Sequence, residues 1–234
     1  MIRTSPHQRL ALFTVLMLSS VGSALADPAA LDALSSKDAA GGLRAALSKG
    51  VDVAVSQLGA NNGFLNDPKV AIPLPGGLEK AEKELHRLGM GRQADELKVT
   101  MNHAAEQAVA QAKPIFKQAL QHMTLSDAKG ILTGGDGAGT AYFKRTTSAQ
   151  LTTSFRPVIT RETAKLGVTA KYDELAGKAA MLGLMSAQDA NINDYVTAKA
   201  LDGLFSRVAE EEHQIRKDPL GQASSLIKKV FGAL

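Results

Sequence analysis

GRQADELKVTMNHAAEQAVAQAKPIFKQALQHM, residues 91–123, is the stretch that decides the fold. Its apolar side chains recur at steps of three and four residues, which places them on one face of an α-helix. They are Leu97, Met101, Ala104, Ala105, Ala108, Ala112, Ile115, Phe116, Ala119 and Met123. Pro114 lies within this pattern, where it removes a backbone donor and crowds the preceding turn. We therefore expect one long helix that is kinked at Pro114 rather than interrupted.

Helical spacing extends through most of the remaining chain, because Ala, Leu and Lys dominate and β-branched residues rarely alternate with polar ones. Serine, threonine and glycine mark where the helices begin and end. The helices predicted on this basis cover a segment from near Ser35 to Gly59, Leu78–Leu88, a short one after Thr124, one opening at Thr140 and containing Pro157, Tyr172–Met185, Asp194 to about Lys217, and one from Pro219 onward.

The segment between Ala60 and Gly77 departs from helical spacing, because Asn61-Asn62-Gly63 and the run 72–77 (IPLPGG) favour turns and extended backbone. Its apolar residues predict an ordered connector rather than a domain linker. The fold class we expect is all-α. The architecture is a single-domain multi-helix bundle over residues 27–234, with two proline-kinked helices and one irregular Pro/Gly-rich connector.

The first residues have the features of a secretory signal peptide. Arg3 and Arg9 precede an uncharged apolar run at Leu10–Val21, and the small residues Ala24 and Ala26 follow. The run is shorter than the roughly 20 residues that a membrane-spanning helix needs. We expect cleavage after Ala26 and a periplasmic protein.

Composition narrows the functional classes. The chain has no cysteine, which excludes thiol chemistry, cysteine-ligated metal and a lipoprotein anchor. The 27 Lys and Arg residues barely exceed the 23 Asp and Glu residues, and they form no long basic run with interleaved aromatic residues. We therefore expect no nucleic-acid partner.

Four blocks of sequence form a pattern that extends over essentially the whole chain beyond the expected leader. They are Asn66-Asp67 before Ile72-Pro73-Leu74-Pro75; Met101-Asn102-His103-Ala104-Ala105-Glu106; Gly134-Gly135-Asp136 before Tyr142-Phe143; and 195–205 (YVTAKALDGLF) with Glu211-Glu212 and Ile215-Arg216. Together they resemble the exported bacterial family catalogued as domain of unknown function 4197. The resemblance implies a helical protein of the cell envelope without an assigned activity.

Three motifs suggest chemistry but lack the residues that would complete it. The glycine-rich stretch Gly134–Gly139 has no lysine before Thr140, so it does not match a phosphate loop. We predict a flexible connection between helices, with an anion-binding nest as the alternative. Ser126 and Lys129 match Ser-x-x-Lys without its partner motifs. Glu210 and His213 form a single Glu-x-x-His, for which we expect a solvated face with ion pairs. We assign no catalytic residue, metal-binding residue or cofactor, and we expect the protein not to be an enzyme.

Polar residues within the family-like blocks have two open interpretations. They either form an internal network of hydrogen bonds and ion pairs that fixes the helix register, or they line a groove for a small anionic or peptidic ligand. These candidate ligand-binding residues are Asn102, Glu106, Asp136, Tyr142, Arg145 and Lys199.

The end of the chain has apolar residues at helical spacing from Leu220 to Leu234, with Lys228 and Lys229 off the apolar stripe. Such a helix packs against its own core or rests on an anionic membrane surface. The functional hypothesis is a non-catalytic periplasmic binding or interaction protein with an unknown protein or small-ligand partner. The alternatives are a membrane-surface or envelope-structural protein that uses Leu220–Leu234, and an enzyme whose scattered site has no sequence signature.

Overall fold

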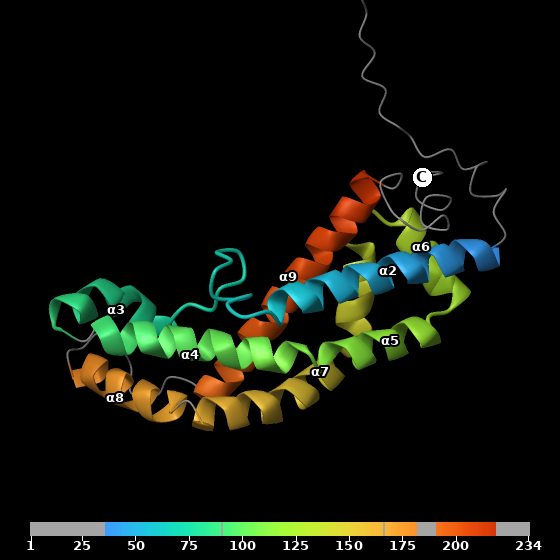
Figure 1. Ribbon diagram of the computed structural model, residues 1–234. Coiled ribbons are helices and arrows are strands. Elements are labelled where there is room, and N and C mark those ends of the chain that lie inside the picture. Colours follow the sequence, from blue (N-terminus) through green and yellow to red (C-terminus); the bar gives the residue numbers. More distant parts are fainter. Residues whose placement is uncertain (1–35, 90, 166, 182–190, 219–234) are drawn as a thin grey trace, which may run out of the picture.

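The computed structural model describes residues 36–89, 91–165, 167–181 and 191–218 (Figure 1). All regular elements within these ranges are helices, which confirms the predicted all-α class for a single domain. The predicted signal peptide, residues 1–26, and the predicted terminal helix from Pro219 lie outside the described residues.

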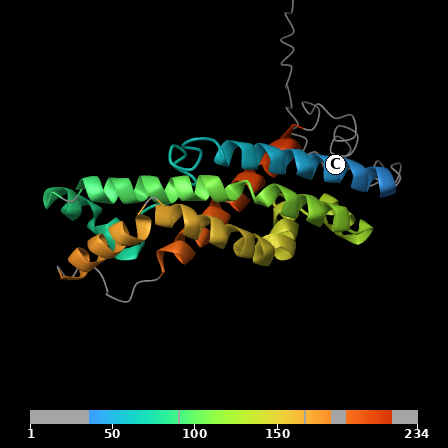
Figure 2. The same ribbon diagram turned by 60° about the horizontal axis from the view of Figure 1, so that its bottom comes forward.

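Eight labelled helices form one elongated body (Figure 1). In chain order they are α2 Ser36–Leu58, α3 Gly76–Arg87, α4 Gly91–Val109, α5 Ala112–His122, α6 Leu125–Thr133, α7 Ala138–Lys165, α8 Val168–Met181 and α9 Ile192–Lys217. Helices α4 and α5 follow one another along the long dimension, and α7 continues beside them into α8 (Figure 1). Helix α9 crosses the others obliquely in both views and packs against α2, α4 and α7 (Figure 2).

Pro114 does not kink a continuous helix, so the prediction for residues 91–123 is wrong at this point. The chain leaves the helix after Val109, the backbone N–H of Gln111 donates to the carbonyl oxygen of Ala108 at 3.0 Å, and a new helix begins at Ala112. Pro114 is the third residue of α5. A first-turn residue has no intrahelical partner for its N–H, so proline loses nothing there. Pro157, by contrast, lies inside the uninterrupted helix α7.

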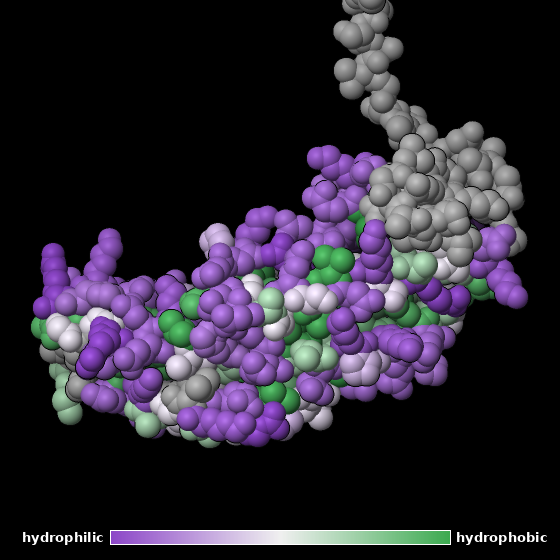
Figure 3. Space-filling model, in the orientation of Figure 1, coloured by the Kyte–Doolittle hydropathy of each residue, from purple (hydrophilic) through white to green (hydrophobic). Residues whose placement is uncertain are grey.

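The core follows the predicted apolar stripe. Phe116 of α5, Phe143 of α7 and Phe205 of α9 meet edge to face, with ring centroids 4.7 Å apart for Phe116–Phe143 and 6.1 Å for Phe116–Phe205. Alanine is the most frequent of the buried residues along α4, and its small side chain lets neighbouring helices approach closely. Hydrophilic residues cover most of the face shown in Figure 3, with apolar residues visible only in scattered patches.

None of the described helices combines the length and apolarity that crossing a bilayer requires.

Gly203 lets α9 press against the connector that precedes α3. A Cβ atom at this position would lie 2.7 Å from Cε1 of Phe64 and 3.3 Å from Cβ of Val70, both buried residues of the connector. Gly203→Ala is therefore expected to lower the free energy of unfolding by about 1–3 kcal/mol through overpacking. The measurement is urea unfolding followed by circular dichroism.

Gly130 provides the matched control, because a Cβ there would meet no atom within 4 Å. It lies inside α6, where glycine is less favourable than alanine. Gly130→Ala should raise stability by about 0.5–1 kcal/mol. Equal effects of the two substitutions would contradict the close approach of α9 to the connector.

Candidate functional site

A groove of about 460 Å³ runs between α5 and α7. We call it the α5–α7 groove. It is lined by side chains of these two helices and by one residue of α6: Ile115, Gln118, Ala119, His122, Asp127, Tyr142, Arg145, Thr146, Thr147 and Gln150. Its volume is within the range of small-molecule sites, and two of the residues predicted to bind a ligand, Tyr142 and Arg145, line it.

Helix periodicity produces the lining. On α5, Gln118 and His122 are one turn apart, and on α7 Tyr142, Thr146 and Gln150 recur at the same spacing, with Arg145 next to Thr146. Buried Tyr142 fixes the two helices to one another, since its hydroxyl donates to the carbonyl oxygen of Ala119 at 2.8 Å. The groove therefore has a rigid, partly apolar floor with polar side chains along its rims.

Arg145 is the cation of the groove, and its side chain is 65% exposed. One guanidinium nitrogen lies 3.1 Å from a carboxylate oxygen of Asp127, and the guanidinium group lies 5.5 Å from the Tyr142 ring centre. Hydrogen bonds from Thr124 lower the pKa of Asp127, and Arg145 adds to this effect, so the carboxylate is charged at neutral pH. Burial raises the pKa of Tyr142, whose hydroxyl therefore stays a donor.

Two glutamines face each other across the groove. The amide nitrogen of Gln150 is 3.4 Å from the amide oxygen of Gln118, which is long for a hydrogen bond between amides. An amide group of a ligand can replace this weak contact with two better ones, while Arg145 pairs with an anionic group. These side chains can hold a polar ligand with an anionic group through hydrogen bonds and an ion pair.

Asn102 and Glu106 are engaged in a different place. Asn102 is fully buried, and its amide accepts from the N–H of Ile72 at 2.8 Å and donates to the carbonyl oxygen of the same residue at 2.9 Å. The Glu106 carboxylate accepts the backbone N–H groups of Asn62 and Phe64, each at 3.2 Å. These two side chains hold the connector against α4, as the internal-network interpretation expects.

Lys199 and Asp136 also lie apart from the groove lining. The Lys199 ammonium is 4.0 Å from the Asp202 carboxylate and 5.9 Å from the Tyr195 ring centre. Burial raises the pKa of Tyr195 to about 12, so its hydroxyl remains protonated and donates to the carbonyl oxygen of Pro73. Asp136 pairs with His213, with 2.8 Å between Oδ2 and Nδ1. The six candidate residues are thus divided among four separate sets of contacts.

Glu210 and His213 lie on the expected partly exposed face with ion pairs, to Lys69 and Asp136, whereas Glu212 between them is buried. Its side chain is 4% exposed and accepts from the backbone N–H groups of Gly139 at 2.9 Å and Thr140 at 2.8 Å. The hydroxyl of Thr140 and the guanidinium group of Arg216 complete its partners, at 2.8 and 3.0 Å. The first turn of α7, at the end of the glycine-rich stretch, therefore holds an anion that the protein itself supplies.

Sequence reasoning missed Glu212 because three consecutive glutamates look like one solvated run. The signal that distinguishes it is periodicity, since Glu212 follows buried Val208 by four residues and lies on the face of α9 that packs inward. Ser126 and Lys129 of the Ser-x-x-Lys match are both exposed, and Thr124 and Asp127 form the capping box of α6 instead.

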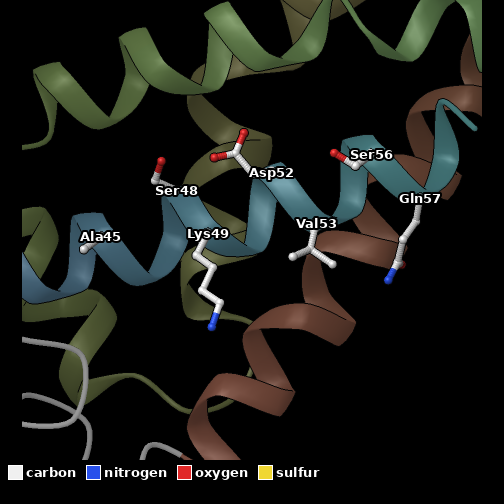
Figure 4. Close-up of a pocket in the computed structure, with 7 residues that line it drawn as sticks. All are labelled: Ala45, Ser48, Lys49, Asp52, Val53, Ser56 and Gln57. Carbon is white, nitrogen blue, oxygen red and sulfur yellow. The ribbon is translucent and has the colours of Figure 1, made fainter. Parts of the chain in front are cut away.

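A larger hollow, of about 590 Å³, follows the outer side of α2 (Figure 4). A single helix provides all of its lining. Ser48, Asp52 and Ser56 point to one side of α2, and Lys49, Val53 and Gln57 point to the other. Because its polar groups diverge, it is a weaker candidate than the α5–α7 groove, where two helices face each other.

Comparison with known proteins gives one match. The family model described as "Protein of unknown function (DUF4197)" matches residues 33–232. No curated protein and no solved structure matches the chain.

Proposed function

The chain belongs to the DUF4197 family, and from that premise we propose that it is a non-catalytic binding protein of the bacterial periplasm. Its ligand is peptide-like and carries an anionic group. The observation that carries this proposal is the α5–α7 groove, in which exposed Arg145 and the weakly paired Gln118 and Gln150 face one opening.

The chemistry of the groove supports a peptide-like ligand. Glutamine side chains donate and accept at once, as a peptide backbone does, and the guanidinium group of Arg145 offers several parallel N–H donors to a carboxylate. Ile115 and Ala119 add apolar surface beneath these groups. A short segment of peptide with a free or side-chain carboxylate fits this combination.

The periplasmic location rests on the expected signal peptide. N-terminal mass analysis of protein from the periplasmic fraction tests it, with Asp27 as the expected first residue. Protein that stays in the cytoplasm with residues 1–26 attached would overturn this part of the proposal.

The ligand is sought by photo-crosslinking in living cells. A photoreactive amino acid at Gln150, on the rim of the groove, is expected to give a discrete crosslinked species that mass spectrometry identifies. The matched position is Thr153, three residues along the same helix, exposed and outside the groove lining. The same species from both positions, or none from Gln150, would contradict a ligand in the groove.

Arg145→Gln tests the anionic group of the ligand. Losing a charge-assisted hydrogen bond of about 1.5–3 kcal/mol should weaken binding of the identified ligand by roughly 10- to 100-fold. Arg156→Gln is the matched control, because Arg156 lies on the same helix in an exposed ion pair with Asp194 at 3.0 Å. Equal losses for the two variants in calorimetric titration would show that the contribution of Arg145 is not specific.

A further inference from the structure

Helices α3 and α4 bring three metal-ligating side chains together at one end of the molecule. Glu82 and His86 are one turn apart on α3, and Asp95 comes from α4. Each offers one ligand atom, and the three atoms lie within 4.8 Å of one another. The closest approach joins His86 Nε2 and Asp95 Oδ1, at 3.5 Å.

The glycine at the start of α4 determines how the imidazole ring of His86 lies. A Cβ atom on Gly91 would be only 2.1 Å from His86 Nδ1, so the ring rests directly against the backbone of α4. Nδ1 is covered by this contact and Nε2 faces Asp95. Nε2, the nitrogen that can bind a metal, therefore already faces the second ligand, Asp95.

The spacing suits a divalent ion of the first transition series. Zinc binds imidazole nitrogen and carboxylate oxygen at about 2.0–2.2 Å, so its tetrahedral ligands lie roughly 3.3–3.6 Å apart. The His86–Asp95 separation already has this value. Glu82 is one-third exposed and its ligand atom lies within 4.8 Å of the other two, so a small change of its side-chain conformation brings it to the ion.

One cation already lies near the cluster. The Lys98 ammonium is 3.8 Å from the Glu82 carboxylate, with both side chains about one-third exposed. A pair that is this long and this exposed contributes little. Two carboxylates exceed one ammonium group in charge, so a metal ion can displace Lys98 from Glu82.

We infer that Glu82, His86 and Asp95 form a binding site for Zn²⁺, with water completing the coordination. The sequence expectation of no metal-binding residue overlooked this set because Asp95 is on a different helix, and spacing along one helix shows only Glu82 and His86. The inference does not depend on the proposed function, since none of the three residues lines the α5–α7 groove.

Zinc titration of the untagged protein by isothermal calorimetry tests the site. One equivalent of Zn²⁺ is expected to bind, and His86→Ala and Asp95→Asn should each weaken binding at least about 10-fold, as even outer-shell changes at zinc sites do. His213→Ala is the matched control, because His213 also pairs with a carboxylate, that of Asp136, yet belongs to no cluster of three ligands within the described residues. It should leave zinc affinity unchanged.

A second variant moves the histidine without removing a ligand. The added methyl group of Gly91→Ala displaces the imidazole ring from its position against α4, so zinc affinity should fall although all three ligands remain. Zinc binding through Nε2 should also fix the His86 ring in the tautomer that is protonated at Nδ1, which the ¹⁵N shifts of its two ring nitrogens report. Equal zinc affinity of the wild type and His86→Ala, or no binding by the wild type, would overturn the inference.

Discussion

Glu212→Ala is expected to lower the free energy of unfolding by about 3–5 kcal/mol, the usual cost of breaking a buried ion pair. The substitution removes the acceptor of the Gly139 and Thr140 N–H groups and the carboxylate that faces the Arg216 guanidinium. Both contacts lie in the buried region where α9 meets the first turn of α7, so water cannot easily replace the lost partner. Urea unfolding monitored by circular dichroism measures the loss.

Two further variants show whether the loss of stability comes from the buried contacts of Glu212. Glu212→Gln keeps one acceptor oxygen and should cost less than alanine. Glu210→Ala removes a neighbouring glutamate whose ion pairs with Lys69 and Arg207 are partly exposed, and it should cost less than about 1 kcal/mol. If Glu210→Ala and Glu212→Ala were equally mild, the buried capping role of Glu212 would be wrong.

Asn102→Ala is expected to cost about 3 kcal/mol, because it leaves both the N–H and the carbonyl of buried Ile72 without their side-chain partner. The loss should be local as well as global. Amide hydrogen exchange at Ile72 should accelerate more than exchange in α7, since the connector loses its attachment to α4.

Asn66→Ala is the control, because Asn66 is an exposed asparagine of the same connector, and its replacement should change stability by less than about 0.5 kcal/mol. The comparison also decides between the two interpretations of the family-like residues. Were Asn102 a ligand-binding residue, its replacement would weaken ligand binding and leave both the stability and the exchange at Ile72 unchanged.

The sequence was sufficient to predict the helical class and most helix positions, because apolar side chains at three- and four-residue steps have few other ways to be buried. The end of α2 at Leu58, just before Gly59, and the cap of α6 at Thr124 both agree with local signals. Pro114 was misjudged because a proline inside an apolar stripe and a proline in the first turn of a new helix leave the same residue pattern.

The candidate site was only partly predictable, for a physical reason. Tyr142 and Arg145 share the α5–α7 groove because they lie on one helix, and local spacing brings them together. Glu212 and the first turn of α7 meet only through the tertiary fold. Asp95 joins His86 in the same way, across two helices. Contacts of this kind depend on how helices cross, which spacing along the chain does not contain.

The hydrogen bond between Glu212 and Gly139 also affects the order in which parts of the molecule can fold. The two residues are 73 positions apart, so the first turn of α7 gains this hydrogen-bond partner only from a side chain near the end of the described chain. A chain that is made from its N-terminus onward cannot form this contact until α9 has also been made. Truncations that remove α9 are therefore expected to be more damaging than their length suggests, because they also remove the acceptor of the first turn of α7.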